Sequence, residues 1–152
     1  MDRIDRQIIA ALQRDGRQKL ADLAETVGLS ATPCARRISR LEQDGIITGY
    51  SARVDQEKLG LPLNVFIFVE LDTQSRDAIK EFESALRRFD EVMECYLMTG
   101  TRDVLIRVVA ADLTAFDRFL EDGLMRISGI RSMRSSFALR TMIRRNALPA
   151  GS

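Results

Sequence analysis

Residues 23–45 read LAETVGLSATPCARRISRLEQDG, two segments of helical apolar period that each end at a glycine. Gly28 follows the first segment, where a left-handed backbone closes a helix, and Gly45 closes the second. Ser30 is a favourable N-cap residue for the second segment. The stretch therefore predicts two helices joined by a tight turn, over about residues 19–27 and 30–44.

The second of these helices has two different faces. At about 100° per residue, Cys34, Ile38 and Leu41 share one arc, which we expect to face the domain core. The opposite arc carries cations and hydrogen-bonding groups, namely Thr32, Arg36, Ser39, Arg40 and Gln43. Three arginines and no acidic residue lie between Ala31 and Leu41. A short helix, a glycine-containing turn and a helix with a basic outer face are what a DNA-binding helix-turn-helix requires.

The outer face predicts the DNA contacts. Arg36 and Arg40 are predicted near base edges, because arginine makes a bidentate contact to guanine. Arg37 is predicted to contact phosphates together with groups near the helix N-terminus. The alternative is a solvated charged surface without a partner, but the turn, the cap and the buried arc together favour DNA. The predicted DNA-binding set is Ser30, Thr32, Arg36, Arg37, Ser39, Arg40 and Gln43.

The flanking segments complete a helical domain and lead out of it. Ile4, Ile8 and Leu12 follow a helical period from Asp2 to Arg14 and predict a first helix. The β-branched stretch over residues 46–54 predicts a short strand and hinge. Gly60-Leu61-Pro62 then marks a domain boundary.

Beyond this boundary, strand-like and helix-like patterns follow each other in the order βαββαβ. The predicted strands are residues 63–71, 92–98, 104–109 and 130–140, and the predicted helices are residues 76–89 and 112–125. This order predicts an α+β protein whose second domain is ferredoxin-like, with a four-stranded antiparallel sheet and both helices on one face.

Both faces of the predicted sheet are apolar. Val65, Ile67 and Val69 point one way in the first strand, while Phe66 and Phe68 point the other way. Two helices can cover only one face, and a bare apolar sheet is unusual on a soluble monomer. We expect a second copy of the chain to cover the other face. The alternative is partial shielding by the hinge and the C-terminal tail.

Composition argues against an enzyme. The chain has no histidine, which removes the most frequent general base and the commonest metal ligand. Cys34 and Cys95 form no CxxC pair, and no glycine-rich nucleotide-binding loop is present. No stretch approaches the roughly 20 apolar residues that span a bilayer. We therefore predict a cytoplasmic protein without a catalytic site, metal, cofactor or membrane partner.

At this point the chain resembles the Lrp/AsnC family of feast/famine regulators. The resemblance runs from Met1 to about Pro149, and no single piece carries it alone. Its specific parts are DRIDR at 2–6, LAETVGLSATPC at 23–34, RRISRLEQDGII at 36–47, Gly49-Tyr50, Leu59-Gly60, TGTRD at 99–103 and Gly129-Ile130. It implies a winged helix-turn-helix joined to a domain that dimerises through its sheet and assembles into octameric rings.

The resemblance also implies a small effector, commonly an amino acid, near the Gly100 loop. Backbone N–H groups from Gly100 to Asp103 would hold a carboxylate, and the Asp103 side chain an ammonium group. Asp103 as a plain turn residue is the alternative. The sequence departs from the family at Thr101 and Arg102: the cation favours an anionic ligand or pairs with Asp103. The predicted effector-binding set is Gly100, Thr101, Arg102, Asp103, Ser135 and Ser136.

The sequence thus predicts a homo-oligomeric transcription regulator that binds double-stranded DNA and is modulated by an effector. Residues 1–48 are predicted as the helix-turn-helix domain, 49–61 as the linker and 62–152 as the effector-binding and oligomerisation domain. One alternative is a nucleoid-associated architectural protein that wraps DNA without an effector. Another is an enzyme built on the ferredoxin-like domain, which the missing histidine disfavours.

Overall fold

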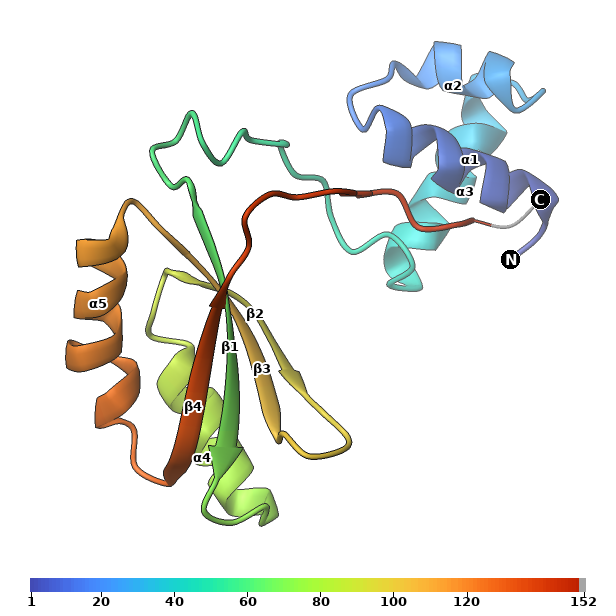
Figure 1. The fold of residues 1–152 in the computed structure, drawn as a ribbon. Helices are drawn as coiled ribbons and strands as arrows, with labels where there is room; N and C mark the ends of the chain where they lie inside the picture. The colour runs from blue at the N-terminus through green and yellow to red at the C-terminus, as the bar shows by residue number, and fades with distance from the viewer. Residues whose placement is uncertain (151–152) are drawn as a thin grey trace. The chain divides into compact units, whose positions relative to one another are not determined.

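The computed structural model describes residues 1–150, and the first part of the chain holds the predicted helices (Figure 1). They are α1 (Arg3–Arg14), α2 (Leu20–Thr26) and α3 (Ala31–Gln43). The predicted bounds exceed the observed ones only by capping residues such as Asp2 and Asp44. The helix-turn-helix arrangement predicted from the sequence is confirmed.

A reciprocal pair of hydrogen bonds fixes the start of α1. The backbone N–H of Asp5 donates to Oδ1 of Asp2 over 2.9 Å, and the backbone N–H of Asp2 donates to Oδ2 of Asp5 over 2.9 Å. Both N–H groups would otherwise lack acceptors within the helix, so this capping box stabilises its first turn. It also fixes the positions of both carboxylates at the N-terminal end of α1.

The three helices share one small apolar core. Gly28 and Gly45 have φ of 69° and 68°, the left-handed backbone that ends α2 and α3. Cys34 and Leu41 are buried, as the predicted inner arc of α3 requires. The buried members of this core are Ile8, Ala11, Leu23, Ala24, Val27, Cys34 and Leu41.

The strand predicted over residues 46–54 is wrong, because this segment contains neither helix nor strand. The backbone N–H groups of Ile46 and Ile47 donate to the carbonyl oxygen of Leu41, which ties the segment to the end of α3. Ile47 also packs against the helical core. A strand needs a neighbouring strand to satisfy its backbone groups, and the helical part of the chain offers none.

The second part of the chain has the predicted βαββαβ order (Figure 1). The four strands form one antiparallel sheet in the order β2-β3-β1-β4, so the ferredoxin-like prediction is confirmed. The elements are β1 (Leu63–Leu71), α4 (Arg76–Leu86), β2 (Val92–Leu97), β3 (Val104–Ala110), α5 (Leu113–Asp122), the 3-10 helix η1 (Leu124–Arg126) and β4 (Ile130–Phe137).

Four of these elements end earlier than predicted, namely α4, β2, α5 and β4. At the early end of α5 the backbone leaves the helical conformation at Gly123, where a Cβ atom would lie 2.5 Å from the Phe119 carbonyl oxygen, so glycine suits this position. The backbone turns at this glycine into η1, which places Leu124 in the core. Phe89, predicted within α4, lies beyond the end of that helix. Its ring packs edge-on against the ring of Phe119, with 5.5 Å between the ring centroids.

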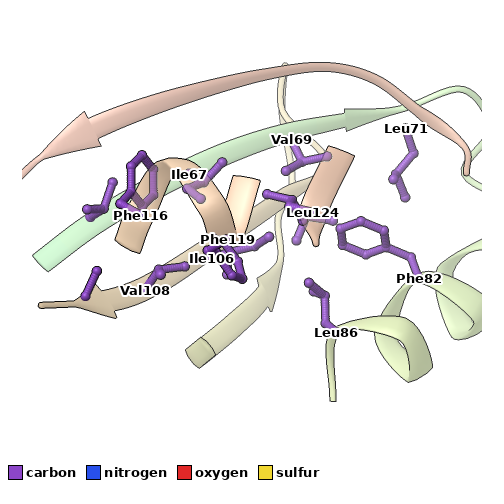
Figure 2. Packing of buried hydrophobic residues seen from close by; sticks show 13 residues of the cluster. Ile67, Val69, Leu71, Phe82, Leu86, Ile106, Val108, Phe116, Phe119 and Leu124 are labelled. Carbon is purple, nitrogen blue, oxygen red and sulfur yellow. The ribbon is translucent and has the colours of Figure 1, made fainter. Parts of the chain in front are cut away.

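One face of the sheet forms the main core with the two helices. Ile67 of β1 lies opposite Ile106 of β3, and both are fully buried. Figure 2 shows Phe82 of α4 and Phe116 of α5 among the side chains of this cluster. The alternating burial along β1 is the pattern that the sequence predicts for a strand with one covered face.

The opposite face of the sheet is apolar at its centre. Phe66 and Phe68 of β1 and Leu105 of β3 lie there half-buried, while α4 and α5 pack against the other face. Two buried side-chain atoms within residues 1–150 have no hydrogen-bond partner, Oδ1 of Asn64 and Nη1 of Arg107, and both residues belong to this face. An unpaired buried polar atom costs free energy.

The end of the chain returns to the helices. The Gln13 side chain exchanges two hydrogen bonds with the backbone of Leu148, and Arg6 donates to the carbonyl oxygen of Ala150. The chain accordingly forms two compact units, residues 1–53 with the segment from Met142 onward, and residues 54–141. Sequence analysis placed residues 142–152 with the second domain; the described part of this tail contacts the first.

Candidate functional site

The outer face of α3 carries the predicted DNA-binding residues. Thr32, Arg36, Ser39 and Gln43 are exposed and follow one another at helical spacing along this face. Ser30 occupies the N-cap position, as predicted, but its side chain makes no capping hydrogen bond. The structure therefore presents the hydroxyl and guanidinium groups of this row to solvent.

Arg37 and Arg40 are held differently from Arg36, because both form ion pairs with the start of α1. Nη1 of Arg37 lies 2.6 Å from Oδ2 of Asp2 and 2.8 Å from Oδ1 of Asp5. Nη2 of Arg40 lies 2.7 Å from Oδ2 of Asp5. No ion pair of Arg36 occurs within residues 1–150, so its charge is the uncompensated one on this face.

Sequence reasoning missed these ion pairs. It noted that no acidic residue lies between Ala31 and Leu41, but Asp2 and Asp5 come from the start of another helix. Nothing in the sequence signalled them, because the helix dipole by itself favours acidic residues at a helix start and does not indicate which cation they contact. The roles of Arg36, Arg37 and Arg40 toward DNA stay predictions.

The same contacts shift the acidity of both carboxyl groups. The backbone N–H of Asp5 and the Arg37 guanidinium lower the pKa of Asp2 to about 2. Burial alone would raise the pKa of Asp5, but hydrogen bonds from the Asp2 backbone and Arg37, with the charge of Arg40, hold it below its usual value. Both groups are therefore ionised at neutral pH.

We expect the helical unit to lose stability as the pH falls from 3.8, the ordinary Asp value, to about 2. A carboxyl whose pKa is lower in the folded state stabilises that state above its ordinary pKa, and the contribution disappears as the folded group becomes protonated. Circular dichroism melts across this range would measure the loss. The variant Asp2→Asn/Asp5→Asn should show a flatter pH dependence; an unchanged acid transition would assign it to other carboxyl groups.

The loop between β2 and β3 contains the predicted effector residues. The Asp103 side chain is buried, and its Oδ2 accepts a hydrogen bond from the Leu71 backbone over 2.7 Å. Its Oδ1 accepts from Nε2 of Gln74 over 2.6 Å. Asp103 therefore fixes the loop to the end of β1, and Gln74 is a neighbour that sequence analysis did not single out.

The tip of this loop is open. Gly100 and Thr101 are exposed, and Gly100 has a φ of 113°, which favours glycine. Within residues 1–150, the backbone N–H groups of 100–102 donate to no protein acceptor. They are free to bind an anionic group.

Arg102 pairs with Glu70 of β1, so the expected alternative of an Arg102–Asp103 pair is wrong for this structure. The second carboxylate oxygen of Glu70 accepts a hydrogen bond from Ser132 of β4 over 2.8 Å. This network neutralises the cation beside the loop. Ser132 is therefore the β4 serine that the structure connects to the loop, and sequence analysis missed it.

Ser135 and Ser136 are not brought together with the loop. Ser135 lies opposite Ile67 and Ser136 opposite Phe66, further along β1 than the Glu70–Ser132 pair. Neighbouring strand residues point to opposite faces, so the two serines cannot line one site within this chain. Their role toward an effector stays a prediction.

Within residues 1–150, no helix has both the length and the apolar character needed to cross a membrane. Residues 1–150 also hold no group of three or more acidic or cysteine side chains arranged to bind a metal ion.

Comparison with known families matches both units. Residues 1–48 match the winged helix-turn-helix DNA-binding family, and residues 64–148 match the Lrp/AsnC ligand binding domain. The two matches fall on the helices that carry Arg36 and on the domain that carries the Asp103 loop. The two matched families therefore agree with the predicted helix-turn-helix and with the predicted ligand-sensing domain.

Individual relatives extend over nearly the whole chain. The Bkd operon transcriptional regulator of Pseudomonas aeruginosa is 44% identical over 149 residues, 98% of this chain and 97% of the relative. An AsnC family transcriptional regulator from Agrobacterium tumefaciens superposes with a TM-score of 0.93 at 40% identity, over 98% of this chain and 97% of that one. A Neisseria meningitidis transcriptional regulator, solved as an L-Met complex, has a TM-score of 0.92 at 35% identity, over 98% and 96%.

These relatives are transcription regulators, and they align with both the DNA-binding and the ligand-binding unit. The resemblance noted in the sequence is thereby confirmed. The chain belongs to the Lrp/AsnC family, whose members combine a DNA-binding helix-turn-helix with a ligand-binding domain.

Proposed function

We propose that this regulator reads specific DNA sites with the outer face of α3 and that an amino acid bound at the β2–β3 loop modulates this binding. The observation that carries the DNA part is the uncompensated charge of Arg36 in the middle of an exposed hydrogen-bonding row. Bacterial chromosomal DNA lies in the cytoplasm, so we propose that the protein acts there.

The contacts divide by position along α3. Arg36 and Arg40 reach base edges, where a bidentate guanidinium distinguishes guanine, and Ser39 and Gln43 donate or accept beside them. Arg37 lies about 100° around the helix from Arg36 and contacts phosphates. Ser30 and Thr32 contact phosphates at the start of the helix.

The open loop supports an amino acid as the effector. Free N–H groups from Gly100 to Arg102 suit a carboxylate, and each Asp103 oxygen has a lone pair beyond its present hydrogen bond, which suits an ammonium group. The L-Met complex of the Neisseria relative supports the same ligand class. Because Glu70 already neutralises Arg102, we propose a neutral side chain rather than an acidic one.

The open face of the sheet supports a homodimer. Phe66, Phe68 and Leu105 offer an apolar centre, and a second copy would supply partners for the unpaired atoms of Asn64 and Arg107. Two copies also suit DNA sites with paired half-sites. We propose that dimers assemble further, up to octamers, and that the effector shifts this packing.

A ligand panel tests the effector proposal. Neutral amino acids should raise the melting temperature of the full chain, since a ligand at about 100 times its Kd stabilises the folded state by about 2.7 kcal/mol. Footprinting should then show a preferred site whose protection pattern changes with the active amino acid. Stabilisation by no amino acid, with a steep salt dependence and no preferred site, would favour the architectural protein instead.

A further inference from the structure

Asp5 stands out among the acidic residues of the helical unit because its side chain is fully buried. Its Oδ2 accepts from the Asp2 backbone and from Arg40, and its Oδ1 accepts from Arg37. Asp5 therefore connects the start of α1 to two arginines of α3.

Capping alone does not account for a charged residue at this position. A neutral asparagine could accept the Asp2 N–H, and burying a carboxylate costs free energy unless cations pair with it. The helix start also favours a negative charge, but it is the pairing with two arginines that offsets the cost of burying this one. Arg37 is paired with two carboxylates and its side chain is 26% exposed, while the Arg40 side chain is 53% exposed.

This difference in exposure separates the two arginines. Arg40 gives one Nη2 hydrogen bond to Asp5 and keeps its other donors for an outside acceptor. A guanidinium held from behind by a carboxylate is fixed in its plane, which favours a bidentate contact over a loose attraction to phosphates. The charge of Arg37, by contrast, is largely compensated by the carboxylates of Asp2 and Asp5.

We propose that Asp5 is a positioning residue for DNA recognition: by holding Arg40 in place it raises the preference for specific sites over random DNA, and by compensating Arg37 it weakens the attraction to DNA of any sequence. The proposal rests on the assignment of α3 as the DNA-reading helix. It predicts two opposite effects of removing the Asp5 charge. Affinity for DNA of any sequence should rise, and the preference for a specific site over random DNA should fall.

Fluorescence anisotropy of the full chain tests this with two duplexes, a site selected from random sequence by the unaltered protein and a random duplex, across a range of salt. Asp5→Asn should bind random DNA more tightly, with a salt slope steeper by about one. The ratio of the two affinities should fall about tenfold, the size of one lost base contact. A variant that is merely less stable would weaken both duplexes by the same factor.

Two matched variants locate the effect. Asp2→Asn also removes a partner of Arg37 but leaves Arg40 paired, so it should change the affinity ratio by less than about twofold. Arg40→Gln should lower the ratio by itself, and adding Asp5→Asn to it should lower the ratio no further. An equal loss of discrimination in Asp2→Asn, or an additive loss in the double variant, would overturn the proposal.

If Asp5→Asn does not fold, Asp5→Glu tests the positioning role instead. It keeps the charge and displaces the carboxylate, so the affinity ratio should fall while the salt slope on random DNA stays the same. An unchanged ratio in a folded Asp5→Glu protein would overturn the positioning role. Arg36→Ala, which leaves Asp5 untouched, tests the underlying assignment separately: unchanged binding to both duplexes would refute α3 as the reading helix, whatever Asp5 does.

Discussion

Removing the charges of Arg36, Arg37 and Arg40 together is expected to lower affinity for a selected DNA site by about a thousandfold. Two base contacts are lost at about 1–3 kcal/mol each, together with one phosphate contact. Replacing Arg37 and Arg40 alone would leave Asp5 as a buried carboxylate without a cation. The arginines are therefore changed to glutamine in an Asp5→Asn background, which keeps the helical unit free of an unpaired buried charge.

Titration of the selected duplex would measure the loss, and a thermal melt would show that the variant is folded. The matched control changes three exposed arginines of α4 and the residues after it, Arg76, Arg87 and Arg88, to glutamine. This control removes the same number of guanidinium groups from the other unit and should bind DNA nearly as well as the unaltered chain. Equal affinity of both variants would mean that α3 does not contact DNA.

Asp103 is expected to show the second large effect, and two substitutions separate its two roles. Asp103→Ala leaves the buried Leu71 N–H without an acceptor and should destabilise the sheet unit by about 1–3 kcal/mol. Asp103→Asn keeps an acceptor oxygen for the Leu71 N–H and can donate its NH2 group to the Gln74 side-chain oxygen once that amide turns over, but it loses the charge. It should therefore fold nearly normally, yet bind the amino acid on the order of a hundredfold more weakly, because the ammonium group loses its counter-ion.

Calorimetric titration with the amino acid found in the ligand panel would measure this, alongside denaturant unfolding of both variants. If Asp103→Asn bound the effector as well as the unaltered chain, Asp103 would be a structural turn residue. A loss confined to Asp103→Ala would lead to the same conclusion.

The sequence predicted those parts of the fold that depend on local periodicity. The alternation of Val65, Ile67 and Val69 gave the bounds of β1, and the arc of Cys34 and Leu41 gave the inner face of α3. The strand over 46–54 failed because a β-branched stretch becomes a strand only when another strand pairs with it. The residue types of a segment show that it could form a strand, but whether it does depends on another strand lying beside it in the fold.

The candidate sites were less predictable for the same reason. Sequence spacing placed Arg36 and Arg40 on one face, but it could not show that Asp5, more than thirty residues earlier, contacts Arg40 and not Arg36. The partner of Arg102 was also misjudged, since Glu70 approaches it across the sheet and Asp103 only follows it in sequence. Charge partners depend on the tertiary fold, and local patterns do not contain them.

The contact between Gln13 and Leu148 has a topological consequence. Because the tail returns to the helices, the sensing unit is an insertion within a discontinuous DNA-binding unit, and the polypeptide passes between them twice, near residues 53–54 and 141–142. A change at the sheet therefore has two covalent routes to the helices. A single nick in the first crossing would still leave the sheet tethered through the second.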